Sequence, residues 1–177
     1  MVKGKVEPLT DDDVRAVLGV AMVNLRDYLI IRLLAKTGMR IGELTRMKTS
    51  DIDFKNNVLY IPIAKWDSAR EVPFDTVTKS VLSLYISEKK IDGQLWQIGD
   101  RAIQNMIKKY ARLAGISKNV SPHSFRHYFG TTLIRNGLDP HKVKGLMGHR
   151  SISTTDIYVH IPPRDVMASY EKIMGGW

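Results

Sequence analysis

The chain has 177 residues, of which 44% are hydrophobic and 25% charged, values typical of a folded globular protein. No apolar run reaches the roughly 18 residues of a membrane span, no signal peptide opens the chain, and the absence of cysteine excludes disulfides and thiolate metal sites. We therefore expect one well-packed cytoplasmic domain over residues 1–177.

The net charge of +9 is distributed unevenly along the chain. Residues 1–100 hold 15 Lys/Arg and 14 Asp/Glu, a net charge of +1, whereas residues 101–177 hold 12 and 4, a net charge of +8. The basic excess of the second half favours a polyanionic partner.

Two helices are predicted near the start of the chain. Residues 1–9 lack periodicity and should be flexible, and Thr10 followed by three aspartates predicts a helix that runs to about Val20. Asn24 can cap a longer helix that ends at Gly38 in the left-handed conformation. The apolar stripe of this second helix consists of Leu25, Leu29, Leu33 and Leu34.

Arg40 follows this second helix on a short turn, before helical character resumes over residues 41–47. Arginines at helix ends commonly cap backbone carbonyls, which is the ordinary interpretation of such a residue. Glu43, three residues further on, can instead orient the guanidinium from one side.

Residues 52–74 change from helical to β periodicity. Residues 53–57 form a turn signal, residues 58–63 are rich in β-formers, and residues 71–74 predict a third short strand. Lys65 lies where the second strand turns into the third. Most lysines at such a position only keep a hairpin edge soluble, but a small hairpin can also carry one ammonium group into a cleft.

Two amphipathic helices are expected next. Asp75 can cap a helix to about Lys89, with Val77, Val81, Leu84 and Tyr85 on its apolar face. A second helix begins near Asp100 and ends at Gly115. Its inward residues are Ile103, Met106, Ile107, Tyr110 and Leu113, whereas Lys108, Lys109 and Arg112 face outward, where they could contact a DNA backbone.

The stretch from Ser121 to Ile161 concentrates the residues suited to phosphate chemistry. Ser121 and Pro122 are a good N-cap and first-turn pair, so His123 and Arg126 should share one face near the positive end of a helix. An anionic oxygen is favoured at such a place.

That helix should stop at Gly137, and Asp139 with Pro140 should begin the next one. Gly145 and Gly148 frame a turn into His149, and Tyr158 follows nine residues later on an expected short helix. Residues 165–174 predict a last amphipathic helix with an apolar stripe of Val166, Met167, Tyr170, Ile173 and Met174.

Three motifs in this order resemble the tyrosine recombinases, the family of phage integrases and Xer-type recombinases. They are T-G-M-R-I-G-E-L at residues 37–44, A-K-W-D-S-A-R-E-V-P-F at residues 64–74, and the stretch at residues 121–161. The resemblance extends from about Thr10 to Ile161. Matched residue by residue, it implies six active-site residues, namely Arg40, Lys65, His123, Arg126, His149 and the nucleophile Tyr158.

The resemblance also implies a fold, a reaction and partners. The expected fold is α+β, mainly helical with a small three-stranded antiparallel sheet, and the expected activity is metal-independent cleavage and rejoining of DNA through a 3′-phosphotyrosine, with no cofactor. The expected partners are recombination-site DNA and other copies of this chain. The protein is expected to be a monomer in free solution and to form a tetramer on DNA. The expected DNA-binding residues are Lys108, Lys109, Arg112, Lys142, Lys144 and Arg150.

The family's usual N-terminal DNA-clamp domain has no counterpart among these residues, so residues 1–177 are expected to be the catalytic domain, with residues 164–177 as its C-terminal helix. Two other interpretations stay open. Residues 140–161 also fit a non-catalytic helix-turn-helix DNA-binding module, and a recombinase that binds without cutting is a third candidate. The spacing of His123 and His127 is only weak support for zinc, because no H-E-x-x-H pattern accompanies it.

Overall fold

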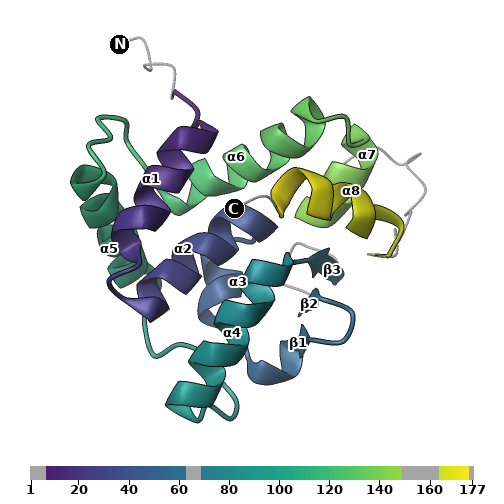
Figure 1. Ribbon diagram of the computed structural model, residues 1–177, viewed down its shortest axis with the longest axis horizontal. Helices are drawn as coiled ribbons and strands as arrows, with labels where there is room; N and C mark the ends of the chain where they lie inside the picture. Colours follow the sequence, from purple (N-terminus) through teal and green to yellow (C-terminus); the bar gives the residue numbers. More distant parts are fainter. Residues whose placement is uncertain (1–6, 63–68, 149–163, 176–177) are drawn as a thin grey trace.

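The computed structural model describes residues 7–62, 69–148 and 164–175 (Figure 1). Its helices are α1 (Asp11–Ala21), α2 (Leu25–Thr37), α3 (Ile41–Thr45), α4 (Thr76–Lys89), α5 (Asp100–Leu113), α6 (Pro122–Arg135), α7 (Pro140–Met147) and α8 (Arg164–Met174), with one 3-10 helix, η1 (Thr49–Asp51). Its strands are β1 (Ile52–Asp53), β2 (Val58–Ile61) and β3 (Arg70–Pro73). No helix in these ranges is both long and apolar enough to cross a membrane.

The helix starts follow the capping residues of the sequence. The Thr10 hydroxyl accepts a hydrogen bond from the Asp13 amide, and the Asp13 carboxylate accepts one from the Thr10 amide at 2.8 Å, which together form a capping box. Asn24 caps α2 and Ser121 caps α6 in the predicted manner. Local chemistry therefore sets where these helices begin.

Helix α2 is the centre of the core and packs against α1, α4 and α6 (Figure 1). Every side chain from Leu29 to Thr37 is buried, including those of Arg32 and Lys36. The helix ends at Gly38, whose φ of 61° lies in the left-handed region. Because α2 is buried from Leu29 to its C-terminal end, that end is a fixed point from which the next segment leaves.

The sheet has the order β1-β2-β3 and is antiparallel throughout. Strand β2 pairs with β3 in a register that sets Leu59 opposite Val72, and both of these side chains are buried. Strand β3 packs against α7, so the sheet joins the helical body at that point. The predicted fold class, mainly helical with a small antiparallel sheet, is confirmed.

Two predicted helix faces differ from the structure. On α4, Val77 and Leu84 are 40% and 49% exposed, and the buried residues are Thr78, Leu82 and Tyr85. A polar contact explains the difference on α4. Arg32 of α2 donates to the Thr78 hydroxyl at 2.9 Å, which turns the Thr78 side of α4 inward. On α5, the final apolar residue, Leu113, is 60% exposed at the helix end.

Helix α8 packs on its own chain. Val166, Tyr170 and Met174, spaced four residues apart, are fully buried, and α8 contacts α6. The Tyr170 hydroxyl donates to the Lys36 carbonyl at 2.8 Å, and the Lys36 ammonium donates to the Met174 carbonyl. The C-terminal helix thus completes the core beside the end of α2.

Lys36 gives the fold a testable pH dependence. Burial and the neighbouring Arg32 guanidinium lower the pKa of Lys36 to about 7, from an ordinary value of 10.5 in the unfolded chain. Between these values the unfolded state binds more protons, so the free energy of unfolding should rise with pH, by up to about 1.4 kcal/mol per unit.

Lys36→Met should remove this rise. Urea unfolding of both proteins between about pH 7 and 9, below the range in which tyrosines ionise, measures it. An equally steep rise in the Lys36→Met protein would contradict the assignment.

Candidate active site

Arg40 lies at the junction between the buried end of α2 and the start of α3. Its backbone N–H donates to Glu43 Oε2 at 2.6 Å, and its Nη1 donates to Glu43 Oε1 at 3.2 Å. The Arg40 side chain is 40% exposed, whereas that of Glu43 is only 6% exposed. Glu43 therefore contacts both the backbone and the guanidinium of Arg40.

Both Arg70 and Arg40 keep the Glu43 carboxylate ionised. Burial alone would raise the pKa of Glu43, but hydrogen bonds and charge from Arg70 and Arg40 outweigh burial and leave this pKa below its usual value. Arg70 of β3 donates from Nη1 and Nη2 to the two carboxylate oxygens at 2.9 and 2.8 Å. Such a bidentate pair is strong and geometrically specific.

Arg70 was not among the residues predicted for the site. A signal for it was present, because alternate residues of a strand share a face and Val72, two residues on, is a core residue. Arg70 is accordingly 5% exposed. What the alternation alone could not supply is the partner, Glu43, which lies 27 residues earlier in the chain.

Arg126 approaches the same region from α6. Its Nη1 donates to the Gly38 carbonyl at 2.6 Å, its Nη2 donates to the Met147 carbonyl, and the residue is 5% exposed. A Cβ atom at Gly38 would lie 2.3 Å from the Phe129 ring, so only glycine allows α2 and α6 to approach this closely. Arg126 thus bonds both the end of α2, two residues before Arg40, and the end of α7.

The two histidines of α6 are exposed on its surface. His123 lies in the first turn, three residues before Arg126, where the positive helix end favours an anion. His127 is exposed, while its neighbours Tyr128 and Phe129 are buried. Within residues 7–62, 69–148 and 164–175, no group of three His, Asp or Glu side chains could hold a metal, which gives the zinc interpretation no support there.

Lys65, His149, Arg150 and Tyr158 lie outside the described residues, so their roles remain predictions.

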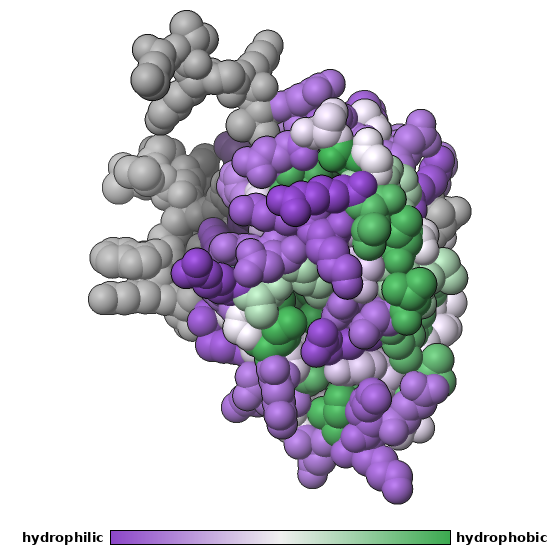
Figure 2. Space-filling view, turned by 90° about the vertical axis from the view of Figure 1, so that its left-hand side faces the viewer, coloured by the Kyte–Doolittle hydropathy of each residue, from purple (hydrophilic) through white to green (hydrophobic). Residues whose placement is uncertain are grey.

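The other basic residues predicted to bind DNA fall into two sets. Lys108, Lys109 and Arg112 are exposed on α5, whereas α7 carries the half-buried Lys142 and the exposed Lys144. Figure 1 places α5 and α7 at opposite sides of the helical body. Hydrophilic residues predominate over the centre of the face on which α5 lies (Figure 2). The set on α7 belongs to an element that Arg126 contacts, through its bond to the Met147 carbonyl.

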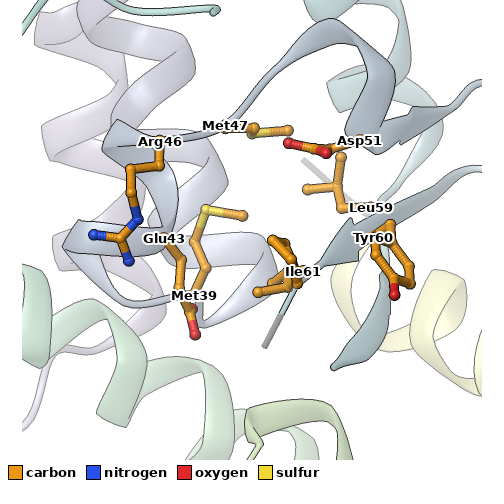
Figure 3. Close-up of a pocket in the computed structure, with 9 residues that line it drawn as sticks. Met39, Glu43, Arg46, Met47, Asp51, Leu59, Tyr60 and Ile61 are labelled. Atoms are coloured by element: carbon orange, nitrogen blue, oxygen red, sulfur yellow. The ribbon is translucent and has the colours of Figure 1, made fainter. Parts of the chain in front are cut away.

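Two hollows near the sheet are unsuited to the candidate chemistry. A pocket of about 60 Å³ lies between α3 and β2, lined by Glu43, Arg46 and Tyr60 among mostly apolar side chains (Figure 3), well below the roughly 300–1,000 Å³ of a ligand site. A groove of about 700 Å³ between the sheet and α8 is lined by Asp51, Asp53 and Glu71. Carboxylates repel phosphate, so we do not expect DNA in this groove.

The arrangement is suited to holding an anion. The partly exposed Arg40 lies two residues beyond Gly38 at the end of α2, and the buried Arg126 bonds the Gly38 carbonyl at that same end. His123 lies at the N-terminus of α6, the helix that carries Arg126. Guanidinium groups match the geometry of phosphate oxygens in pairs.

Comparison with known proteins gives this geometry a family. A family model described as the phage integrase family matches residues 7–164. Tyrosine recombinase XerA of Saccharolobus solfataricus is 34% identical over 170 residues, covering 96% of this chain and 57% of the relative. XerA of Pyrococcus horikoshii is 30% identical over 190 residues, covering 98% of this chain and 66% of the relative. The chain thus spans about three fifths of the length of these relatives.

Solved structures agree with the sequence relatives. A crystal structure of XerA recombinase matches with a TM-score of 0.75 and 30% identity, over 94% of this chain and 64% of that chain. The integrase from mycobacterium phage Brujita matches with a TM-score of 0.77 over 98% of this chain and 60% of that one, and its 23% identity supports the fold alone. The chain belongs to the phage integrase family, and it shares the catalytic-domain fold of the tyrosine recombinases.

Proposed function

We propose that this chain is the catalytic part of a site-specific DNA recombinase that cleaves and rejoins DNA through a covalent 3′-phosphotyrosine on Tyr158. The observation that carries the proposal is the placement of two arginines at the end of α2, with Arg126 bonded to the Gly38 carbonyl and Arg40 two residues beyond it. Membership of the phage integrase family supports it further.

The proposed roles follow from the chemistry of phosphoryl transfer, which needs stabilised oxygens, a nucleophile and an acid. Arg40 and Arg126 would stabilise the non-bridging oxygens, a task that divalent metals perform in other enzymes. The Tyr158 hydroxyl would attack phosphorus and break the bond to the 5′ oxygen, forming the 3′-phosphotyrosine. Lys65 would protonate the departing 5′ oxygen, and His123 and His149 would donate hydrogen bonds and help to move the phenolic proton.

A non-catalytic helix-turn-helix protein is the alternative of another class. It would account for the basic second half of the chain, but it gives no reason for the Arg40–Glu43–Arg70 network, which lies in the first half. A recombinase that binds without cutting is disfavoured because all six positions of the family's active site are filled in the sequence.

Double-stranded DNA is the proposed partner. Solved structures similar in fold include XerH recombinase bound to difH substrate and Tn1549 integrase in complex with transposon end DNA. Because recombination joins two duplexes, we propose four protomers around paired sites, formed from monomers in free solution. Action on DNA also favours a cytoplasmic location.

Tyr158 is the proposed nucleophile, and a trapping experiment can test it. A DNA substrate nicked beside the cleavage site should trap the parent protein as a covalent complex on a denaturing gel, in excess chelator as well as in its absence. Tyr158→Phe should abolish this band and leave DNA binding nearly unchanged, because it removes only the attacking oxygen. If the Tyr158→Phe protein forms the complex as well as the parent does, Tyr158 is not the nucleophile.

Removal of Arg40 and removal of Arg126 should affect stability differently. Arg40→Ala should lower the cleavage rate by about 10²–10³-fold, the loss seen for one oxyanion donor, at little cost in stability because its side chain is 40% exposed. Arg126→Ala should lower both the rate and the stability, because each buried carbonyl left without a donor costs about 1–3 kcal/mol. Urea unfolding beside a single-turnover assay tests this, and equal stability losses for the two variants would contradict it.

Protomers of this chain should assemble only on DNA. Val166, Tyr170 and Met174 of α8 are already buried against their own chain, and Met167 and Ile173 pack partly against the same core, so this stripe is largely used within the protomer and should not join free protomers. Light scattering should give a monomer without DNA and a larger complex with paired sites. A stable tetramer in free solution would overturn the proposal.

A further inference from the structure

Arg70 makes three directed contacts from a buried position on β3. Its Nη1 and Nη2 bond the two carboxylate oxygens of Glu43 at 2.9 and 2.8 Å, and its Nε donates to the Leu146 carbonyl at 2.8 Å. The exposed fractions of the Arg70 and Glu43 side chains are 5% and 6%. One guanidinium therefore joins α3 to the end of α7.

Glu43 transmits the position of Arg70 to Arg40. The carboxylate that accepts both Nη groups of Arg70 also accepts the Arg40 backbone N–H at 2.6 Å and Arg40 Nη1 at 3.2 Å. The contact to Arg40 Nη1 is the longest of these, and Arg40 is much the more exposed partner. The carboxylate is thus held by the Arg70 guanidinium on one side and by the Arg40 backbone N–H on the other, and the Arg40 side chain takes its orientation from it.

The same guanidinium also shapes the chain that leads to His149. A Cβ atom at Gly148 would lie 2.8 Å from Arg70 Nη1, and Gly148 has a φ of 68°, which favours glycine. Together with the bond to the Leu146 carbonyl, this contact seats the end of α7 directly on Arg70. Two segments of the candidate site therefore contact one buried residue.

We propose that Arg70 is a positioning residue that orients Arg40 through Glu43 and fixes the end of α7 before His149. This inference rests on the proposed function for its effect on cleavage, but the positioning itself concerns this chain without DNA. The competing interpretation is that Arg70 only contributes stability, as a buried ion pair. Arg32, which pairs with Asp75 at 2.8 Å and is 1% exposed, is a matched example of such a pair elsewhere in the core.

The first measurement uses the protein without DNA. The Arg40 amide bonds Glu43, so its NMR chemical shift and hydrogen-exchange rate report the position of that carboxylate. Arg70→Lys keeps the charge but loses the planar fork, and it should speed exchange at Arg40. Arg32→Lys, the control, should leave the Arg40 amide unchanged. An unchanged Arg40 amide in Arg70→Lys, or an equal change in both variants, would overturn the proposal.

The second measurement is single-turnover cleavage at saturating DNA, at a temperature where thermal melts show all variants folded. Arg70→Lys and Glu43→Gln should each lower the rate on the order of tenfold to a hundredfold, with affinity for DNA changed less than about threefold. The double variant should be no slower than the slower single variant, because both act through one contact. Arg32→Lys should cleave at the parental rate.

Parental cleavage by Arg70→Lys, or an equal loss in Arg32→Lys, would mean that Arg70 contributes only to the fold. If the parent protein itself formed no covalent complex with DNA, the proposed function would fail, and exchange at the Arg40 amide would still decide the positioning role.

Discussion

The carboxylate of Glu43 is shared by two arginines, and the arrangement of the candidate site depends on this sharing. Arg70 of β3 donates to both carboxylate oxygens, and Arg40 donates to the same carboxylate from its backbone N–H and from its guanidinium. A buried carboxylate without partners would be costly, and here paired charges and hydrogen bonds keep it ionised. The result is a rigid base from which one partly exposed arginine extends.

Arg126 is likewise a buried arginine that joins separate segments, but its hydrogen-bond acceptors are backbone carbonyls and not a carboxylate. It bonds the Gly38 carbonyl at the end of α2 and the Met147 carbonyl near the end of α7, so a buried cation satisfies two helix ends that would otherwise lack donors. Segments distant in sequence are thereby fixed near one another. Such preorganisation would favour the proposed transfer of a phosphodiester, because fixed charges need not rearrange as the reaction proceeds.

The sequence was sufficient for the features that depend on local chemistry. Thr10, Asn24 and Ser121 cap the helices that they were predicted to cap, and Gly38 ends α2 in the left-handed conformation. The predicted buried face of α4 was wrong because the buried Arg32 hydrogen-bonds the polar Thr78 and draws it inward. A pattern of apolar residues does not reveal such a contact. Arg70 was missed because its role depends on Glu43, a partner that only the folded chain brings close. The roles of Lys65, His149 and Tyr158 remain predictions from the sequence.

If these residues serve cleavage of DNA by a tyrosine, the covalent bond itself can be located on Tyr158. Trypsin cuts after Arg150 and Arg164, and the peptide between them contains Tyr158 as its single tyrosine. Mass spectrometry of protein reacted with a nicked site and then digested with nuclease and trypsin should find a nucleotide on residue 158 of this peptide. A nucleotide on a different tyrosine, or only unmodified peptide from a reaction that has cut its DNA, would contradict the account.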